Sequence, residues 1–122
     1  MAEPTRLGHP DRKVEFMGKM SKEKGKRGER ELASKLREYG YDARRGVQYQ
    51  GSKDSPDVVG LRGIHIEVKR TEKLSLYDAL SQSKGDAGED MPVVMHRRNN
   101  CEWVVIQPLE DWIKLYKALE TD

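Results

Sequence analysis

Residues 55–69 read SPDVVGLRGIHIEVK, two short apolar runs separated by a glycine-containing turn. In the second run Ile64, Ile66 and Val68 alternate with polar residues, which is the two-residue period of a β-strand. A three-residue loop that ends at Gly63 suits a type I turn with a bulge, because that turn needs a residue in the left-handed conformation. The segment is therefore predicted to form a β-hairpin.

The length of the loop decides which side chains meet across the hairpin. A two-residue loop at Arg62-Gly63 would place Asp57 opposite Val68, whereas the three-residue loop places Asp57 opposite Glu67. Lys69 follows Glu67 at the strand period and shares its face. We therefore expect Asp57, Glu67 and Lys69 to converge on one face of the hairpin.

Two carboxylates side by side repel each other, and a divalent cation would remove that cost. Hard oxygen ligands suit Mg²⁺, which keeps several waters and also binds phosphate oxygens. A lysine two residues further on can orient a water or offset the charge that develops on a phosphate. This equipment is typical of metal-assisted phosphodiester hydrolysis; the alternative is an exposed hairpin with scattered charges.

A third acid lies in the predicted first helix, which runs from Ser21 to Tyr39 and stops at Gly40. Glu29 falls on the inward stripe because it lies three and seven residues before Leu32 and Leu36. Glu31 and Glu38 fall on other faces and are expected to be exposed to solvent. The expected close approach of a neighbouring backbone rests on two residues without side chains, Gly25 and Gly28.

The remaining pattern predicts an α/β fold, a central mixed β-sheet flanked by helices in the order α-β-β-β-α-β-β-α. Residues 1–20 are predicted to be a flexible tail, and residues 21–122 a single domain. The expected strands are Tyr41–Val47, Val58–Leu61, Ile64–Arg70, Pro92–Arg97 and Glu102–Ile106, and the expected later helices are Ser75–Ser83, opened by a capping box with Asp78, and Pro108–Leu119.

Composition narrows the functional classes. The 122 residues are 35% hydrophobic and 36% charged with a net charge of +2, which suits one small core and excludes a histone-like polycation. Residues 12–45 carry twelve Lys and Arg against six acids, a balance that suits a polyanionic partner. No apolar run is long enough to span a bilayer or to act as a secretory signal. The single cysteine, Cys101, indicates neither an internal disulfide nor a zinc site, so an intracellular protein is expected.

These motifs together resemble the archaeal-type Holliday junction resolvases of the PD-(D/E)xK nuclease superfamily. The resemblance covers about residues 24–83 and rests on KGKRGEREL at 24–32, YDARR at 41–45, GSK at 51–53 before Asp57, and IEVK at 66–69. The family pattern consists of a G-x-x-x-E on the first helix, an arginine on the next strand, and then D and E-x-K. The residues that match it one by one are Gly25, Glu29, Arg45, Asp57, Glu67 and Lys69. A restriction-endonuclease-like core is the fold that this resemblance implies.

The resemblance also implies roles for individual residues. Asp57 and Glu67 would bind Mg²⁺, or Mn²⁺ in its place, with the backbone carbonyl of Val68 as a further ligand and Glu29 acting through water. Lys69 would be the catalytic lysine, and Gln82 an accessory residue of the site. The expected contacts to the DNA backbone are Arg45 and Ser52, accompanied by the basic residues Lys24, Lys26, Arg27, Arg30, Arg44 and Lys53. Family members act as homodimers that cut two opposed strands of a four-way DNA junction.

Several alternatives stay open. The chain departs from the archaeal pattern in a longer loop before Asp57 and in a compact ending after Leu119, and it also resembles resolvase-like nucleases of bacteriophages. The expected location is therefore the cytoplasm. For a phage-encoded member, this would be the cytoplasm of a bacterial host. A related nuclease acting on flaps, ends or duplex DNA is one alternative. A non-catalytic DNA-binding module is another, although the complete set of Glu29, Asp57, Glu67 and Lys69 argues against it.

The dimer contact has two candidate locations in the sequence. One is the strand 103–106, and the other is the apolar stripe of the last helix, formed by Leu109, Trp112, Ile113, Tyr116 and Leu119. Because a small domain also needs such side chains in its own core, the sequence does not choose between core and dimer contact for either segment.

Overall fold

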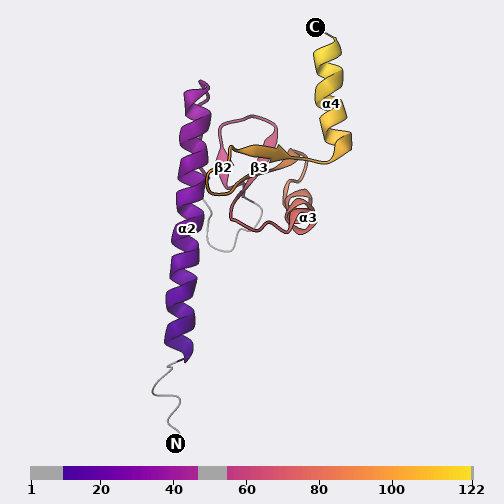
Figure 1. The fold of residues 1–122 in the computed structure, drawn as a ribbon. Coiled ribbons are helices and arrows are strands. Elements are labelled where there is room, and N and C mark those ends of the chain that lie inside the picture. The colour runs from indigo at the N-terminus through magenta and orange to yellow at the C-terminus, as the bar shows by residue number, and fades with distance from the viewer. Residues whose placement is uncertain (1–9, 47–54, 122) are drawn as a thin grey trace, which may run out of the picture.

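A computed structural model describes residues 10–46 and 55–121, with side chains described from residue 22 onward. Its elements follow one another in the predicted order of helices and strands (Figure 1). They are α2 (Pro10–Glu38), β1 (Arg44–Arg45), β2 (Val58–Val59), β3 (Ile64–Arg70), α3 (Leu76–Asp86), β4 (Met91–Arg97), β5 (Val104–Ile106) and α4 (Leu109–Glu120).

The strands form one five-stranded mixed sheet in the order β1-β2-β3-β4-β5. β3 and β4 are parallel, and every other neighbouring pair is antiparallel. The single parallel pair follows from the crossover through α3, because parallel neighbours cannot be joined by a tight turn. The predicted α/β architecture with a central mixed sheet is thus confirmed, although β1, β2 and β5 are shorter than the strands expected from the sequence.

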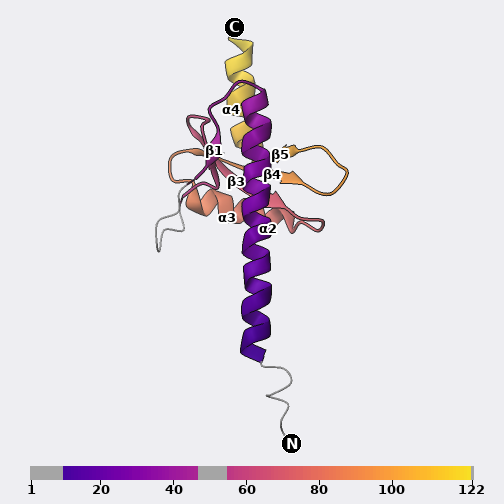
Figure 2. The same cartoon turned by 90° about the vertical axis from the view of Figure 1, so that its left-hand side faces the viewer.

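The first helix is longer than predicted. It begins at Pro10, eleven residues before Ser21, so the predicted start of the helix at Ser21 is wrong. Residues 10–20 are rich in Lys, Glu, Arg and Met, which favour helices, and proline is well tolerated at a first helical position. In two perpendicular views the N-terminal half of α2 projects beyond the sheet (Figures 1 and 2).

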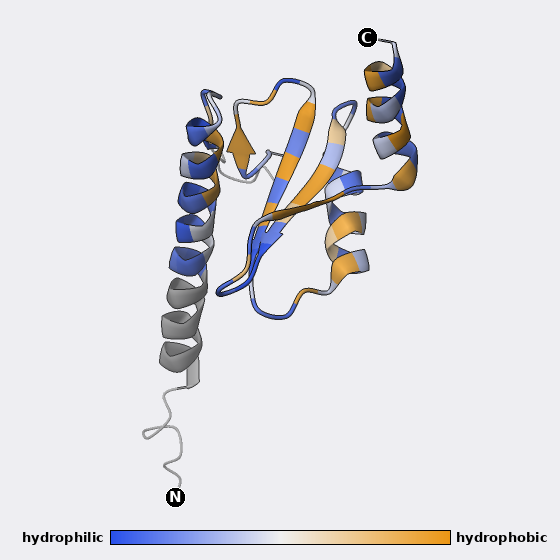
Figure 3. Cartoon of the chain, turned by 45° about the horizontal axis from the view of Figure 1, so that its top comes forward, coloured by the Kyte–Doolittle hydropathy of each residue, from blue (hydrophilic) through white to orange (hydrophobic). Residues whose placement is uncertain are grey.

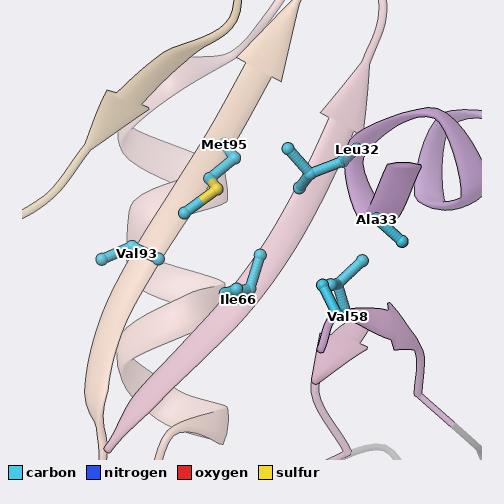
Figure 4. Close-up of a cluster of buried hydrophobic side chains, with 7 residues drawn as sticks. Leu32, Ala33, Val58, Ile66, Val93 and Met95 are labelled. Carbon is cyan, nitrogen blue, oxygen red and sulfur yellow. The ribbon is translucent and has the colours of Figure 1, made fainter. Parts of the chain in front are cut away.

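The core lies between α2 and one face of the sheet. Leu32 and Ala33 on α2 are buried against Val58 of β2 and Ile66 of β3 (Figure 4). Ala43, just before β1, and Val93 and Met95 of β4 complete the cluster. α3 covers the other face (Figure 1), where Ala79 and Ser83 are buried. Because side chains alternate along β3, the residues between its core aliphatics, His65, Glu67 and Lys69, point to the face that α3 covers.

At Gly28, α2 lies close against β3. A Cβ atom added at Gly28 would lie 2.6 Å from the Cβ of Arg70, whereas one added at Gly25 would meet none of the described residues within 4 Å. The expected close approach is therefore confirmed for Gly28, and the described residues make none at Gly25. The absent side chain at Gly28 sets how deeply the helix can sit on the sheet.

Two smaller expectations about α3 are wrong. The helix ends at Asp86 rather than Ser83. Ser75 occupies the N-cap position, but it makes no side-chain bond to the helix backbone; its Oγ donates instead to Oδ2 of Asp78 at 2.6 Å. The serine and the acid therefore bond to each other rather than to the free backbone amides of the first turn.

α4 leaves its apolar stripe uncovered. Leu109 is 74% exposed and Leu119 is 66% exposed, and the Trp112 and Tyr116 rings stack on each other with centroids 5.4 Å apart. Figure 3 shows this helix, which carries both apolar and polar residues, standing away from the sheet. In the part of the chain that the structure describes, no helix combines the length and hydrophobicity needed to cross a membrane.

The fit at Gly28 can be tested with the same substitution at two positions of α2. Gly28→Ala is expected to lower the free energy of unfolding by roughly 1–3 kcal/mol, because the new methyl group overlaps the stem of Arg70. Gly25→Ala, the matched control, is expected to raise it by about 0.5–1 kcal/mol, because alanine favours a helix and the space is open. Urea denaturation would measure both, and equal effects at the two positions would contradict the packing described.

Candidate active site

The β2–β3 hairpin places two acids next to each other. Val58 pairs with Ile66, and Gly63 ends the connection with a φ of +81°. The three-residue loop is therefore confirmed. Asp57 immediately precedes β2, and its backbone N–H donates to the carbonyl oxygen of Ile66 at 2.8 Å. Asp57 and Glu67 consequently meet across the hairpin, as predicted for a three-residue loop between the strands.

Asp57 is held by backbone as well as by its neighbours. The backbone N–H of Val68 donates to its Oδ2 at 2.9 Å. The pKa of Asp57 is raised from 3.8 to about 6, first by burial and then by the negative charge of Glu67, while the bond from Val68 opposes the shift. The hydrogen bond between the two carboxyl groups raises the pKa of Asp57 and opposes the rise at Glu67.

Glu67 is the more deeply buried of the pair, with 5% of its surface exposed. Burial raises its pKa, the charges of Asp86 and Glu29 add to this, and the hydrogen bond with Asp57 and the charge of Lys69 oppose it. Nε2 of His65, which is 2% exposed, lies 3.2 Å from Oε1 of Glu67. The strand period places His65 and Glu67 on the same face, and the structure shows in addition that their side chains are in contact.

Lys69 lies within the electrostatic reach of both acids. Its charge lowers the pKa of Asp57 and that of Glu67. Its Nζ donates to Oε1 of Gln82 on α3 at 3.5 Å. The lysine and the glutamine both line an open cleft of about 360 Å³ at the end of β3. The structure therefore brings together Asp57, Glu67 and Lys69 with the accessory residue Gln82 beside them.

Glu29 reaches this site from α2. It is largely buried, and burial raises its pKa despite the hydrogen bond from Arg45, whose Nε donates to Oε1 of Glu29 at 2.9 Å. The negative charge of Asp57 also raises the pKa of Glu29, so Glu29 lies within electrostatic reach of Asp57. Glu29 thus faces inward as its helical position predicted, and Arg45 is its partner.

The donor set for a metal ion consists of two neighbouring carboxyl groups. Among the described residues, no three His, Cys, Asp or Glu side chains lie close enough to hold an ion by themselves. Mg²⁺ is commonly bound by one or two carboxylates while waters complete its shell. Asp57 and Glu67 fit that mode, with the backbone carbonyl of Val68 as the further oxygen named above, and Glu29 lies outside the pair.

The basic residues assigned to DNA binding do not form one surface. Lys26 and Arg45 line an open groove of about 440 Å³ beside Glu29, whereas Lys24 and Arg27 line another of about 270 Å³ beside Glu31 and Arg70. The two groups lie on different sides of α2. Arg30 is exposed, and Arg44 is exposed beside Asp42 at 3.7 Å. Ser52 and Lys53 lie outside the described residues.

The prediction that Glu31 is solvent-exposed is wrong. Its carboxylate accepts hydrogen bonds from Nε of Arg70 at 3.3 Å and from Arg97. Arg70 and Arg97 are partners in the parallel β3–β4 pairing, so their positive charges lie side by side and need an acid. The helical period alone could not reveal this, because no pattern in the sequence fixes the register of β3 against β4.

The raised pKa of Asp57 makes a prediction about stability. Between pH 4 and 6 the folded chain holds a proton that the unfolded chain releases, so the free energy of unfolding falls as pH rises, by up to roughly 3 kcal/mol from this group. Asp57→Asn removes the group and keeps an acceptor for Val68. Without divalent cations, the stability of Asp57→Asn relative to the unmodified chain should therefore increase from pH 4 to pH 7, as measured by urea denaturation. A difference that is constant with pH would contradict the assignment.

Comparison with known proteins accords with this geometry. The family model described as archaeal Holliday junction resolvase (Hjc) matches residues 20–117. No curated protein and no solved structure matches the chain. The matched span contains the whole sheet, Glu29, and the Asp57–Glu67 hairpin with Lys69. The mixed sheet between helices is consistent with the restriction-endonuclease-like fold, and the chain belongs to the archaeal Holliday junction resolvase (Hjc) family.

Proposed function

We propose that this chain is a Mg²⁺-dependent, structure-selective DNA endonuclease that resolves four-way junctions by paired phosphodiester cleavage. The observation that carries the proposal is the pair of Asp57 and Glu67, a half-buried and a buried carboxyl group next to each other, with the ammonium of Lys69 acting on both. A nuclease that resolves Holliday junctions is what the family supports. The metal, the paired cuts and the roles below are our proposal.

Asp57 and Glu67 would hold the cation, with the carbonyl of Val68 and, through water, Glu29. The chemistry of the donor set fits, because burial raises the pKa of both carboxyl groups and so disfavours their charged forms while no cation is bound. A divalent cation bound between them would offset this cost. When bound, Mg²⁺ or Mn²⁺ would supply Lewis-acid stabilisation of the negative charge on the phosphate.

Lys69 would stabilise charge that develops on the reacting phosphate. Its ammonium is partly exposed, lies on the face of the two acids, and is held at Gln82. A cation that is oriented before the reaction stabilises the transition state without reorganisation. Gln82 would therefore act by holding Lys69 in place.

The groove that contains Lys26 and Arg45 would take the DNA backbone toward Glu29. It brings two basic side chains to the edge of the acidic site, where a phosphodiester must arrive. Lys24, Arg27, Arg30, Arg44, Ser52 and Lys53 remain proposed contacts with the arms of the junction. Because the described members of this set lie on more than one side of α2, the substrate would contact the helix over a wide arc, as a branched DNA does and a single short duplex does not.

Removing either acid should abolish cleavage. Asp57→Asn and Glu67→Gln are each expected to slow cutting of a mobile four-way junction by more than about 100-fold, the upper range for residues that only support a metal ligand. Junction binding should persist or tighten, because a negative charge near phosphate is lost. Matched controls are Asp90→Asn and Glu89→Gln, the same changes at exposed acids between α3 and β4.

The same assay separates the alternatives. The unmodified chain should cut the junction faster than a flap or a linear duplex of the same sequence, and only with a divalent cation. Equal cutting of the three substrates would favour a less selective nuclease of this fold. Cleavage that persists in both acid variants would reject the metal site, and binding without cleavage by the unmodified chain would favour a DNA-binding module.

Paired cuts need two sites, and we propose that a second copy of this chain covers the apolar face of α4. The first turn of α4 carries the exposed Glu110, and its last turn carries Lys117. An antiparallel two-fold pairing would therefore bring opposite charges together while Leu109, Trp112 and Leu119 become buried. Val104 and Val105 of the edge strand β5 are exposed next to α4 in sequence and could extend the same contact.

The double substitution Trp112→Ser with Leu119→Ser should shift the chain from dimer to monomer in sedimentation equilibrium, raising the dissociation constant by at least about 30-fold, because two central apolar anchors are lost. On a plasmid-borne cruciform, this variant should yield nicked rather than linear product. Tyr77→Ser, at an 82% exposed aromatic residue of α3, is the control and should change neither readout. An unmodified chain that is monomeric on the junction would contradict the dimer.

A further inference from the structure

His65 is a buried polar side chain to which the proposed reaction assigns no role. In the described part of the chain, the buried polar or charged residues are His65, Glu67, Ser83 and Asp111. His65 and Glu67 are in contact, with Nε2 and Oε1 3.2 Å apart. A buried histidine thus has as its partner one of the two acids of the proposed metal site.

The direction of this hydrogen bond follows from the chemistry of the pair. Glu67 in the ionised form that would bind a cation can only accept, so the imidazole then presents an N–H at Nε2. His96 offers a contrast on the neighbouring strand, since its Nε2 lies 2.9 Å from the backbone carbonyl of Thr71. The bond of His96 joins a side chain to backbone, whereas the bond of His65 ends on a group with a proposed chemical task.

We propose that His65 is a positioning residue for metal binding: its Nε2–H donates to Oε1 of Glu67 and holds the carboxylate turned toward Asp57. This inference rests on the proposed function, because it concerns how the same two acids would receive a cation. Carboxylates that bind metals are commonly held by a further hydrogen bond, and losing that bond typically weakens metal binding by about 10- to 100-fold.

The two glutamates near the site are held in different ways. Arg45 pairs with Glu29 and brings a permanent positive charge to it. An imidazole N–H can orient a carboxylate without bringing such a charge, so Glu67 keeps its attraction for a cation. The arrangement assigns direct binding to Glu67 and an indirect place to Glu29.

The test is direct binding of Mn²⁺ to the full chain without DNA, measured by electron paramagnetic resonance and by calorimetry. His65→Leu and His65→Asn should bind Mn²⁺ about 10- to 100-fold more weakly, because neither side chain can place an N–H at the Nε2 position. His65→Gln, whose amide can reach that position, should stay within about threefold of the unmodified chain. Thermal unfolding of each variant shows that it is folded, and the Asn and Gln variants decide the question if the Leu variant does not fold.

His96→Asn and His96→Gln are the matched controls and should bind Mn²⁺ as the unmodified chain does. Asn and Leu variants of His65 that bind Mn²⁺ normally would overturn the inference, and so would a Gln variant as weak as the Asn variant. The failure of the proposed function is a separate result: the unmodified chain would then bind no Mn²⁺, or would bind it equally well after Asp57→Asn.

Discussion

The pairing of Val58 with Ile66 is the constraint on which the site depends. A shift of one residue in a β-hairpin sends every side chain of a strand to the opposite face. Here such a slip would turn Glu67 into the aliphatic core and Ile66 toward α3. The packing of Leu32 and Ala33 against Ile66 and the position of Glu67 therefore depend on the same register. The three-residue turn at Gly63 and the packing of the core therefore each favour the same register of the hairpin.

Around this hairpin, the fold has to accommodate acids that would otherwise repel each other. Asp57 and Glu67 lie next to each other with raised pKa values, Glu29 pairs with Arg45, and Glu31 pairs with Arg70 and Arg97. Three of these acids have raised pKa values, and burial is the first cause for each. Glu29 and Glu31 are bound by arginines, whereas Asp57 and Glu67 lie next to each other within reach of the charge of Lys69, and this difference supports the proposal that the pair binds a cation.

The local part of this arrangement was predictable from the sequence, and the long-range part was not. The turn at Gly63, the inward side of Glu29 and the order of the elements follow from spacing within a few residues. The partner of Glu31 was missed because it depends on the pairing of β3 with β4, which α3 separates in the sequence. The start of α2 at Pro10 was missed because prolines and glycines were weighed above the helix-forming residues between them. The same limit applies to α4, because an amphipathic pattern does not say whether its apolar face is covered by this chain.

The ion pairs of Glu29 and Glu31 also hold α2 mechanically. Residues two positions apart on a helix are separated by about 200° around its axis, so the ion pairs of these glutamates lie on nearly opposite sides of the helix. The pair of Glu29 connects α2 to β1 through Arg45, and the pairs of Glu31 connect it to the ends of β3 and β4 through Arg70 and Arg97. Gly28 lets the helix rest against Arg70 between them. The ion pairs on the two sides oppose rotation of α2 about its own axis. If DNA binds as proposed, a phosphate that took Arg45 from Glu29 would remove one of them, and binding in the groove would then be coupled to the freedom of the helix to rotate.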